Sequence, residues 1–463
     1  MNFEVNKYID DHVGDMVADL GRLVRIPSVS AEAEPDAPFG SNCAKALEVM
    51  LSIAQSAGFT VSNFNNIMGE IDLYPGEEPE LAALCHLDVV PAGTGWDSNP
   101  FSLTLKDGRA YGRGTADDKG PAIAVYYAMK AITRSRVKLN RNMRLIVGTD
   151  EECGSADLKE YRKYNKLPKM VFTADADFPV INLEKGMIHS GLKGKCKCGG
   201  TKTIARLQGG TVVNAVPGEA TASVAGFTLE ELNAAAVAMG KPELFTFTEN
   251  GAIINIKIKG KAAHASYPRA GINAITACIA LFANLNCDDG TGDLFKALNT
   301  CYPFGEDNGS SLGIKMSDSK SGVLTEVLSV MDYSCGEFNA KFDIRFPTCG
   351  SVNGIKEILT SKFEQKGFKL SGFSGVEPHY VEENSPFIRA LLKSYTEVTN
   401  KPGKCVAIGG GTYVHDIEGG VAFGANFPGD GDCEHAPNEY IDIKRLVLDA
   451  KIYANAILSI CTQ

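Results

Sequence analysis

Hydrophobic and polar positions divide the chain into two textures. Mostly apolar runs at residues 81–90, 144–149 and 170–173 are typical of strands buried on both faces of a parallel sheet. Between about residues 186 and 378, runs such as 188–191, 253–259 and 339–345 include alternating apolar and polar positions, which predicts one-sided antiparallel strands. From about residue 382 the first texture returns. We therefore expect one domain formed by residues 1–185 and 382–463, interrupted by an inserted domain at 186–381.

Apolar residues at helical spacing predict the helices that cover these strands. In the first domain the pattern favours helices at 5–24, 42–58, 121–132, 385–399 and 441–460, and in the insertion at 228–238, 271–285 and 354–366. Pro27 ends the first of these helices and Gly58 the second. The fold class predicted is α/β, with a mostly parallel or mixed central sheet flanked by helices, plus an inserted α+β domain.

Composition limits the possible partners and the compartment. A chain of 463 residues is too long for one core, and its net charge of −10 argues against nucleic acid or an acidic membrane as partner. The N-terminal residues resemble no secretory signal, and no apolar run is long enough to cross a membrane. The 13 cysteines are an odd number and mostly lie in apolar runs, as expected of reduced thiols in a cytoplasmic protein. Cys196 and Cys198 are too closely spaced for a zinc knuckle and are interpreted as structural.

Titratable residues gather at the predicted end of the strand at 81–90. His86 and Asp88 are two positions apart, so on a strand they would point to the same face. A carboxylate beside a histidine can fix the tautomer of an imidazole that binds a metal. The alternative is a histidine at the edge of a loop with a solvated aspartate.

Three further segments place acids beside predicted strands or a predicted helix. Asp117 and Asp118 lie in the glycine-rich segment 112–120 before a helix, where they could hold a cation or simply cap the helix, and where they would repel phosphate. Glu151 and Glu152 follow the strand at 144–149, and Asp175 follows the strand at 170–173. Acids at the carboxyl ends of buried strands occupy the ligand-binding edge of an open α/β sheet.

Taken together, these segments and an acid-rich C-terminal loop offer five metal ligands: His86, Asp117, Glu152, Asp175 and His435. Two histidines with several carboxylates suit a borderline divalent metal, zinc first. The excess of carboxylates suits two ions that share one bridging acid. Glu151 is the remaining acid, and it could act as general base and acid.

The ordered set of motifs resembles a known family. The set is H-L-D, G-R-G-x-x-D-D-K-G-P, D-E-E, D-x-D-F-P-V-I-N-x-E-K-G and E-H-x-P-N-E-Y. It is similar to the di-zinc peptidase family of carnosinases, aminoacylases, succinyl-diaminopimelate desuccinylases and bacterial dipeptidases. The F-P-V-I-N-x-E-K-G stretch and the large insertion are most like the bacterial dipeptidases, and the resemblance spans nearly the whole chain.

The resemblance implies a role for each matching residue of the first domain. One zinc would be held by His86, Asp117 and Asp175, and the other by Asp117, Glu152 and His435. Asp117 would be the bridge, with Asp118 a weaker candidate. Glu151 matches the general base, and Asp88 matches the residue that orients His86.

The resemblance also implies that the insertion is a lid. His264 matches the histidine that polarises the scissile carbonyl, Arg345 the residue that receives the C-terminal carboxylate of the substrate, and Asn214 a further lid residue. The backbone of Gly410 and Gly411 matches a segment that closes over substrate. A lid of this kind requires an open and a closed state. Because the insertion is long, we expect a monomer, with a homodimer as the alternative.

One position departs from the family pattern. Where the family has G-G-T-Y-A-R, this chain has G-G-T-Y-V-H, so His415 replaces the arginine and the role of the arginine is not carried over. His12, His189 and His379 are expected to be solvated or local hydrogen bonders.

The function predicted is a metal-dependent dipeptidase that cleaves short peptides with two divalent ions, zinc or alternatively manganese or cobalt. An N-acyl-amino-acid deacylase or a carboxypeptidase would use the same chemistry on another substrate. A non-catalytic binding protein on this scaffold should have lost ligands or the base, and here no expected ligand is missing.

Overall fold

The computed structural model describes residues 2–135, 137–431 and 433–462, and the chain forms two compact units. The first unit comprises Met1–Asn182, Tyr380–Val406 and Gly411–Gln463, and the second comprises Leu183–His379 and Ala407–Gly410. The domain limits expected from the sequence, 185/186 and 381/382, lie close to these. The assignment of residues 407–410 to the second unit had no counterpart in the sequence pattern.

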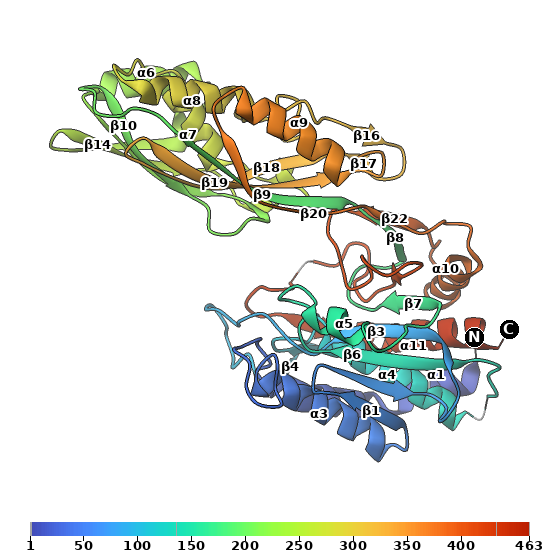
Figure 1. Cartoon of the computed structure of the whole chain (residues 1–463). Helices are drawn as coiled ribbons and strands as arrows, with labels where there is room; N and C mark the ends of the chain where they lie inside the picture. The colour runs from blue at the N-terminus through green and yellow to red at the C-terminus, as the bar shows by residue number, and fades with distance from the viewer. Residues whose placement is uncertain (1, 136, 432, 463) are drawn as a thin grey trace. The chain divides into compact units, whose positions relative to one another are not determined.

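A mixed sheet forms the centre of the first unit (Figure 1). Its strands run in the order β1-β2-β6-β3-β7-β23, of which β6, β3, β7 and β23 are parallel neighbours and β1 and β2 are antiparallel. This confirms the predicted α/β class. The strand bounds are β1 (Thr60–Phe64), β2 (Met68–Asp72), β3 (Pro79–His86), β6 (Asn142–Gly148), β7 (Met170–Thr173) and β23 (Val421–Ala422).

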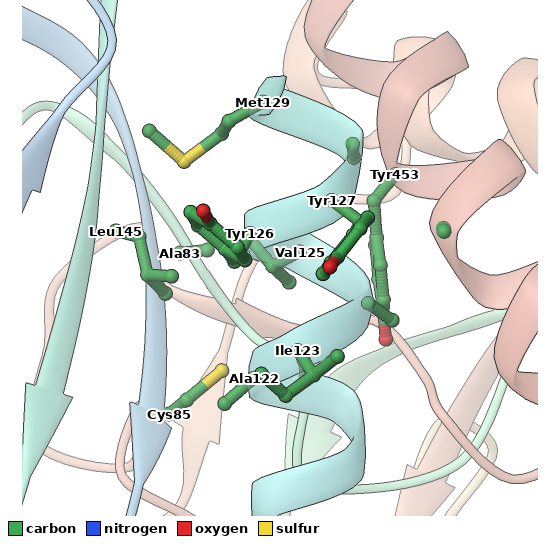
Figure 2. Packing of buried hydrophobic residues seen from close by; sticks show 14 of the residues in the cluster. Ala83, Cys85, Ala122, Ile123, Val125, Tyr126, Tyr127, Met129, Leu145 and Tyr453 are labelled. Carbon is green, nitrogen blue, oxygen red and sulfur yellow. The ribbon is translucent and has the colours of Figure 1, made fainter. Parts of the chain in front are cut away.

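Helices cover the sheet through their apolar sides. The helices of this unit are α1 (Phe3–Asp11), α2 (Val13–Val24), α3 (Ser41–Ser56), α4 (Lys119–Arg134), α5 (Ala156–Tyr161), α10 (Pro386–Thr399) and α11 (Ile443–Cys461). Figure 2 shows α4 at the centre of the core, with Tyr126 near Leu145 of β6 and Ala83 of β3, and Tyr127 near Tyr453 of α11. Because α4 is buried on nearly all sides, the position of its first turn is fixed. Asp117 and Asp118 immediately precede this turn.

The prediction of a single continuous helix at residues 5–24 is wrong. The chain forms two helices, α1 and α2, which meet at His12. The His12 ring stacks on Tyr8 at 3.8 Å between centroids, and its Nδ1 lies 2.7 Å from the Tyr8 carbonyl oxygen. This local side-chain bond competes with the helical backbone pattern and accompanies the break.

The second unit is built on an eight-stranded antiparallel sheet with the order β13-β14-β12-β10-β18-β19-β9-β20. Its strands are β9 (Gly186–Lys195), β10 (Thr203–Gly209), β12 (Glu219–Ala225), β13 (Phe245–Asn250), β14 (Ile253–Lys259), β18 (Thr325–Ser334), β19 (Glu337–Phe346) and β20 (Lys369–Val376). Along β14 exposed and buried residues alternate strictly. The sheet is therefore one-sided, as the alternating pattern predicted.

One apolar cluster joins that sheet to the helices of the second unit. The helices are α6 (Leu229–Ala238), α7 (Ala274–Ala283), α8 (Gly290–Cys301) and α9 (Val352–Glu364), with short 3-10 turns η1 (Pro242–Leu244) and η2 (Pro268–Ala270). Of these, α8 was not expected from the sequence. A small separate pairing, β11 (Ala215–Val216) with β15 (Ala263–His264), carries residues predicted to meet substrate.

The remaining strands are short. The first unit has a three-stranded sheet of β4 (Thr104–Lys106), β5 (Arg109–Tyr111) and β24 (Tyr440–Asp442), and the second has the pair β16 (Ser317–Asp318) and β17 (Gly322–Val323). The chain passes between the units within β8 (Val180–Glu184), β21 (His379–Tyr380) and β22 (Cys405–Ile408). Within the described residues, no helix has the length and apolar character needed to cross a membrane.

Candidate metal centre

The strand β3 delivers His86 to the carboxyl edge of the parallel sheet. The last six residues of β3 are buried, and His86 pairs in register with Gly148 of β6. The backbone N–H of His86 donates to Asp118 Oδ2 at 2.9 Å. Asp118, the weaker candidate for the bridge, therefore accepts a hydrogen bond from this strand, and its carboxyl group holds the backbone of His86 in place.

Asp88 lies beyond the strand, which corrects the expectation that His86 and Asp88 share a strand face. Because β3 ends at His86, a turn of the chain rather than strand periodicity brings the two together. His86 Nδ1 lies 3.0 Å from the Asp88 carbonyl oxygen and 3.4 Å from Asp88 Oδ1. The Asp88 carboxylate also accepts the backbone N–H groups of Glu151 and Glu152, both at 3.1 Å. Asp88 therefore joins the histidine to the acidic turn after β6.

Asp117 lies between the two histidines predicted to bind metal. Its Oδ1 is 2.8 Å from His86 Nε2, and its Oδ2 is 3.0 Å from His435 Nε2. Asp175 Oδ2 lies 3.6 Å from His86 Nε2, and Glu152 Oε2 lies 3.1 Å from His435 Nε2. All five predicted ligands thus come together as two groups that share Asp117.

Glu151 lies on the same side of this cluster as Asp175. A potential ligand atom of Glu151 lies within 4.8 Å of ligand atoms of both His86 and Asp175. Its closeness to them places a carboxylate where it could hold or release a proton beside the reacting group.

The charges of the cluster are unbalanced without a cation. Burial raises the pKa of Glu151 well above its usual value, and neighbouring Asp175 raises it further. Hydrogen bonds with Asp117 and Glu152 raise the pKa of His435 to about 11. For His86, burial acts to lower the pKa, but hydrogen bonds with Asp117, Asp175 and Asp88 outweigh it, and the net shift is upward. Both shifts arise because carboxylates crowd the two imidazoles, and bound divalent ions would balance the same negative charge.

The donor set fits such ions. Imidazole nitrogens and carboxylate oxygens are the ligands of zinc and related metals. The Nδ1 contact of His86 with the Asp88 carbonyl leaves Nε2 to face Asp117 and Asp175, the arrangement usual for a metal-binding histidine. The two oxygens of Asp117 face different histidines, as a bridging carboxylate requires.

Glu439 shapes the loop that carries Asp117, a role the sequence did not reveal. Its buried carboxylate accepts the N–H groups of Gly114 at 3.1 Å, Ala116 at 2.8 Å and Asp117 at 3.3 Å. It also pairs with Arg113 Nη1 at 2.6 Å. The signal that could have indicated it is the glutamate of the final N-E-Y motif, which has no predicted ligand role of its own.

Asp157 supports the acidic turn in a similar way and was also missed. Its Oδ2 accepts the N–H groups of Thr149 at 2.7 Å and Asp150 at 2.9 Å, and the hydroxyl of Tyr413 at 2.5 Å. Burial raises the pKa of Asp157 to about 6. Tyr413 belongs to the G-G-G-T-Y-V-H-D segment, so this segment is tied to the turn that carries Glu151 and Glu152.

His264 and Asn214 come together in the second unit. β15 pairs His264 with Ala215, and Ala265 N donates to the Asn214 carbonyl oxygen at 2.9 Å. His264 is exposed, and its Nδ1 accepts the Ser266 N–H at 3.3 Å. With Nδ1 as acceptor, a neutral His264 carries its proton on Nε2.

Arg345 is buried and paired within the second unit. Its Nε and Nη2 donate to the two carboxylate oxygens of Asp343 at 2.7 and 2.8 Å, and its Nη1 donates to the Gly409 carbonyl oxygen at 2.9 Å. A substrate carboxylate at this arginine would have to share it with Asp343. Gly410 and Gly411 lie where the chain returns to the first unit. His415 N donates to the Thr412 carbonyl oxygen at 3.0 Å.

Similar proteins are known over nearly the full length of the chain. A protein of Bacillus subtilis (strain 168) named "Putative dipeptidase YtjP" is 35% identical over 470 residues, covering 99% of both chains. Human carnosine dipeptidase 1 has a similar fold, with a TM-score of 0.62 at 19% identity over 99% of this chain and 98% of that one. The dipeptidase Dug1p of Saccharomyces cerevisiae gives a TM-score of 0.60 at 15% identity over 98% of each chain.

The family model described as "Peptidase family M20/M25/M40" matches residues 82–459, a range that contains all the predicted metal ligands. The chain belongs to this peptidase family and is a metal-dependent peptide hydrolase.

Proposed function

We propose that this protein is a dipeptidase that uses two divalent ions, zinc first, held by His86, Asp117, Glu152, Asp175 and His435. The observation that carries the proposal is the position of Asp117, with one oxygen 2.8 Å from His86 and the other 3.0 Å from His435. The dipeptidase name of a relative that is 35% identical over almost the full length of both chains supports the substrate class.

The bound ions would supply Lewis-acid stabilisation of charge on the peptide carbonyl and would make water easier to deprotonate. Glu151 accepts the proton of the attacking water on a carboxylate oxygen and later donates it to the leaving amine nitrogen. Asp88 holds both His86 and the backbone of Glu151, and so positions base and ligand together.

The second unit would act as a lid that supplies substrate contacts. A neutral His264 with its proton on Nε2 can donate a hydrogen bond to the carbonyl oxygen as negative charge develops there. Arg345, with Asn214 and the Gly410–Gly411 backbone, would bind the rest of a short peptide. The Asp343–Arg345 pair holds the guanidinium in a fixed orientation, and a terminal carboxylate would share it with Asp343.

We further propose that the enzyme acts as a cytoplasmic monomer on peptides, without nucleic acid or membrane as partner. The net charge of −10 and the 13 cysteines, all free where the structure describes them, support this setting. Size-exclusion chromatography with light scattering tests the monomer directly, and a mass of two chains would refute it.

A substrate panel on the metal-loaded enzyme tests the function. Dipeptides should be hydrolysed with a kcat/KM well above that of tripeptides, C-terminally amidated dipeptides and N-acyl-amino acids. Preference for N-acyl-amino acids would indicate the deacylase alternative, and efficient cleavage of longer peptides at the C-terminus would indicate a carboxypeptidase. Arg345→Met should raise KM for dipeptides more than it lowers kcat, because a binding contact rather than the reacting atoms is removed.

A further inference from the structure

A second pocket lies wholly within the second unit, apart in sequence from every residue of the metal centre. It has a volume of about 280 Å³ and lies between η2, the start of α7, the loop at 304–307 and the start of β18. Its apolar walls include Val216, Ile272, Phe304 and Val327. Its charged lining residues are Arg269, Glu306, Asp307 and Glu326.

Glu326 is the unusual member of this lining. It is only 5% exposed, and its Oε1 is buried without a hydrogen-bond partner among the described residues. The main chain there is fixed, since Glu326 N donates to the Asp307 carbonyl oxygen at 2.9 Å. A buried carboxyl oxygen without a donor is unfavourable, so a guest that provides an N–H or O–H to the Glu326 carboxyl group would stabilise the site.

The other charged groups of the pocket are already engaged. Glu306 accepts the Ser311 backbone N–H and hydroxyl at 2.6 and 2.8 Å. Asp307 accepts Arg269 Nε at 2.9 Å. Three carboxyl groups against one guanidinium leave the pocket acidic, so it should attract cations and exclude anions. Burial raises the pKa of Glu326 well above its usual value, and the nearby acids Glu306, Asp307 and Asp343 raise it further. The empty pocket therefore favours the protonated carboxyl group, and an ammonium group bound beside it would favour the ionised form, with release of that proton to solvent.

The guest is better matched by an organic cation than by a metal ion. Where the chain is described, sets of three ligating atoms converge around His86 and not in this pocket. The acids are therefore too far apart for a compact metal site, while the apolar walls suit a hydrocarbon body. We propose that this pocket binds a small primary amine, with its ammonium group on Glu326 and its apolar part against Val216, Phe304 and Val327.

The pocket wall connects this site to the residues predicted to meet substrate. Val216 and Val327 pack with Ala265 in a small apolar cluster, and Val216 pairs with Ala263 next to His264. Thr325 Oγ1, one residue before Glu326, donates to the Ala265 carbonyl oxygen at 3.3 Å. An amine in the pocket would therefore bear on the segment that carries His264, and occupancy should change turnover. This coupling rests on the proposed function, whereas amine binding does not.

In the binding test, ligand-observed NMR measures the binding of n-butylammonium chloride to the full chain. 1-Butanol and butyrate are measured in the same way as matched probes. The wild-type chain should bind n-butylammonium saturably and the two probes at least tenfold more weakly. Glu326→Gln should weaken n-butylammonium binding at least tenfold, because the ionic hydrogen bond is lost. Glu337→Gln, the same change at an exposed position of β19, is the control and should bind like wild type. Thermal unfolding of each variant verifies folding.

Three results would overturn the amine site. They are no saturable binding of n-butylammonium to the wild-type chain, equally tight binding to Glu326→Gln, or 1-butanol binding as tightly as n-butylammonium. A crystal soaked in the amine that shows only water at Glu326 Oε1 would also overturn it. Dipeptide turnover is then measured with and without n-butylammonium in wild type and Glu326→Gln. An effect confined to wild type supports the coupling to His264, and binding without an effect on turnover refutes the coupling alone.

Discussion

Removal of the Glu439 carboxylate should weaken both the first unit and the metal centre. Glu439 accepts four donors through two oxygens: Arg113 Nη1 and Gly114 N through Oε2, and Ala116 N and Asp117 N through Oε1. In Glu439→Gln one oxygen becomes an NH₂ group, which cannot accept, so at least two buried donors lose their acceptor. One of them can be the guanidinium of Arg113, which is 1% exposed.

The magnitude follows from the cost of an uncompensated buried charge. Removing one partner of a buried ion pair destabilises a protein by about 3–5 kcal/mol. Burial raises the pKa of Glu439 despite Arg113 and the backbone donors, so the ionised pair is not itself a large source of stability. The double variant Arg113→Met/Glu439→Met should therefore cost less than the sum of the two single changes. Zinc affinity of Glu439→Gln should fall about 10–100-fold, because Asp117 loses its support.

The only tryptophan of the chain makes the assay specific to this unit. Trp96 lies beside the pair, with Arg113 Cζ 5.3 Å from the indole ring, so urea unfolding followed by its fluorescence reports on the first unit. Glu80→Gln is the matched control, since the Glu80 side chain is 52% exposed and 3.4 Å from Arg141, and it should change stability by less than about 0.5 kcal/mol. If Glu439→Gln unfolds and binds zinc like Glu80→Gln, the assigned role of Glu439 is wrong.

Four further outcomes are expected. Glu151→Gln should lower kcat by about 10²–10⁴-fold with unchanged metal content by elemental analysis, and equal turnover would show that Glu151 is not the base. EDTA should abolish dipeptide hydrolysis and zinc should restore it; activity that persists in metal-free protein would refute metal dependence. Burial raises the pKa of Asp157 to about 6 from 3.8, so between these pH values the folded state holds a proton that the unfolded state releases. The contribution of this group to stability should therefore fall by at most about 3 kcal/mol as the pH rises from about 4 to about 6. In Asp157→Asn that part of the slope should vanish in urea titrations across this range, and an unchanged slope would contradict the shift. Leu145→Ala, at a fully buried side chain, should cost about 2–5 kcal/mol, whereas Leu105→Ala, at a side chain that is 57% exposed, should be nearly neutral.

The sequence predicted those parts of the fold in which buried positions recur at a regular spacing along the chain. The run at 81–90 could belong only to a strand covered on both faces, and the alternation at 253–259 only to a one-sided strand, so both sheets followed. The helix break at His12 could not be predicted, because it accompanies one local side-chain contact with Tyr8. The strand end at His86 was misplaced, since three apolar residues, Leu87, Val89 and Val90, continue the pattern into a largely buried loop.

The candidate site divides in the same way. The candidate ligands could be chosen because histidines and acids follow the buried strands, and the structure brings these five side chains close together. The supports Glu439 and Asp157 were missed, because their carboxylates accept backbone N–H groups and the sequence does not show which ones; only the N-E-Y motif drew attention to Glu439. The pairing of Arg345 with Asp343 was also missed, although the two alternate along F-D-I-R-F-P and their side chains share one face of β19.

The central claim is that two cations share Asp117, and anomalous diffraction from crystals of the zinc-loaded enzyme tests it most directly. Two zinc peaks should appear within about 4 Å of each other, one beside His86 and Asp175 and the other beside His435 and Glu152, with an Asp117 oxygen on each. A single peak, or two peaks that Asp117 does not bridge, would contradict the proposed centre.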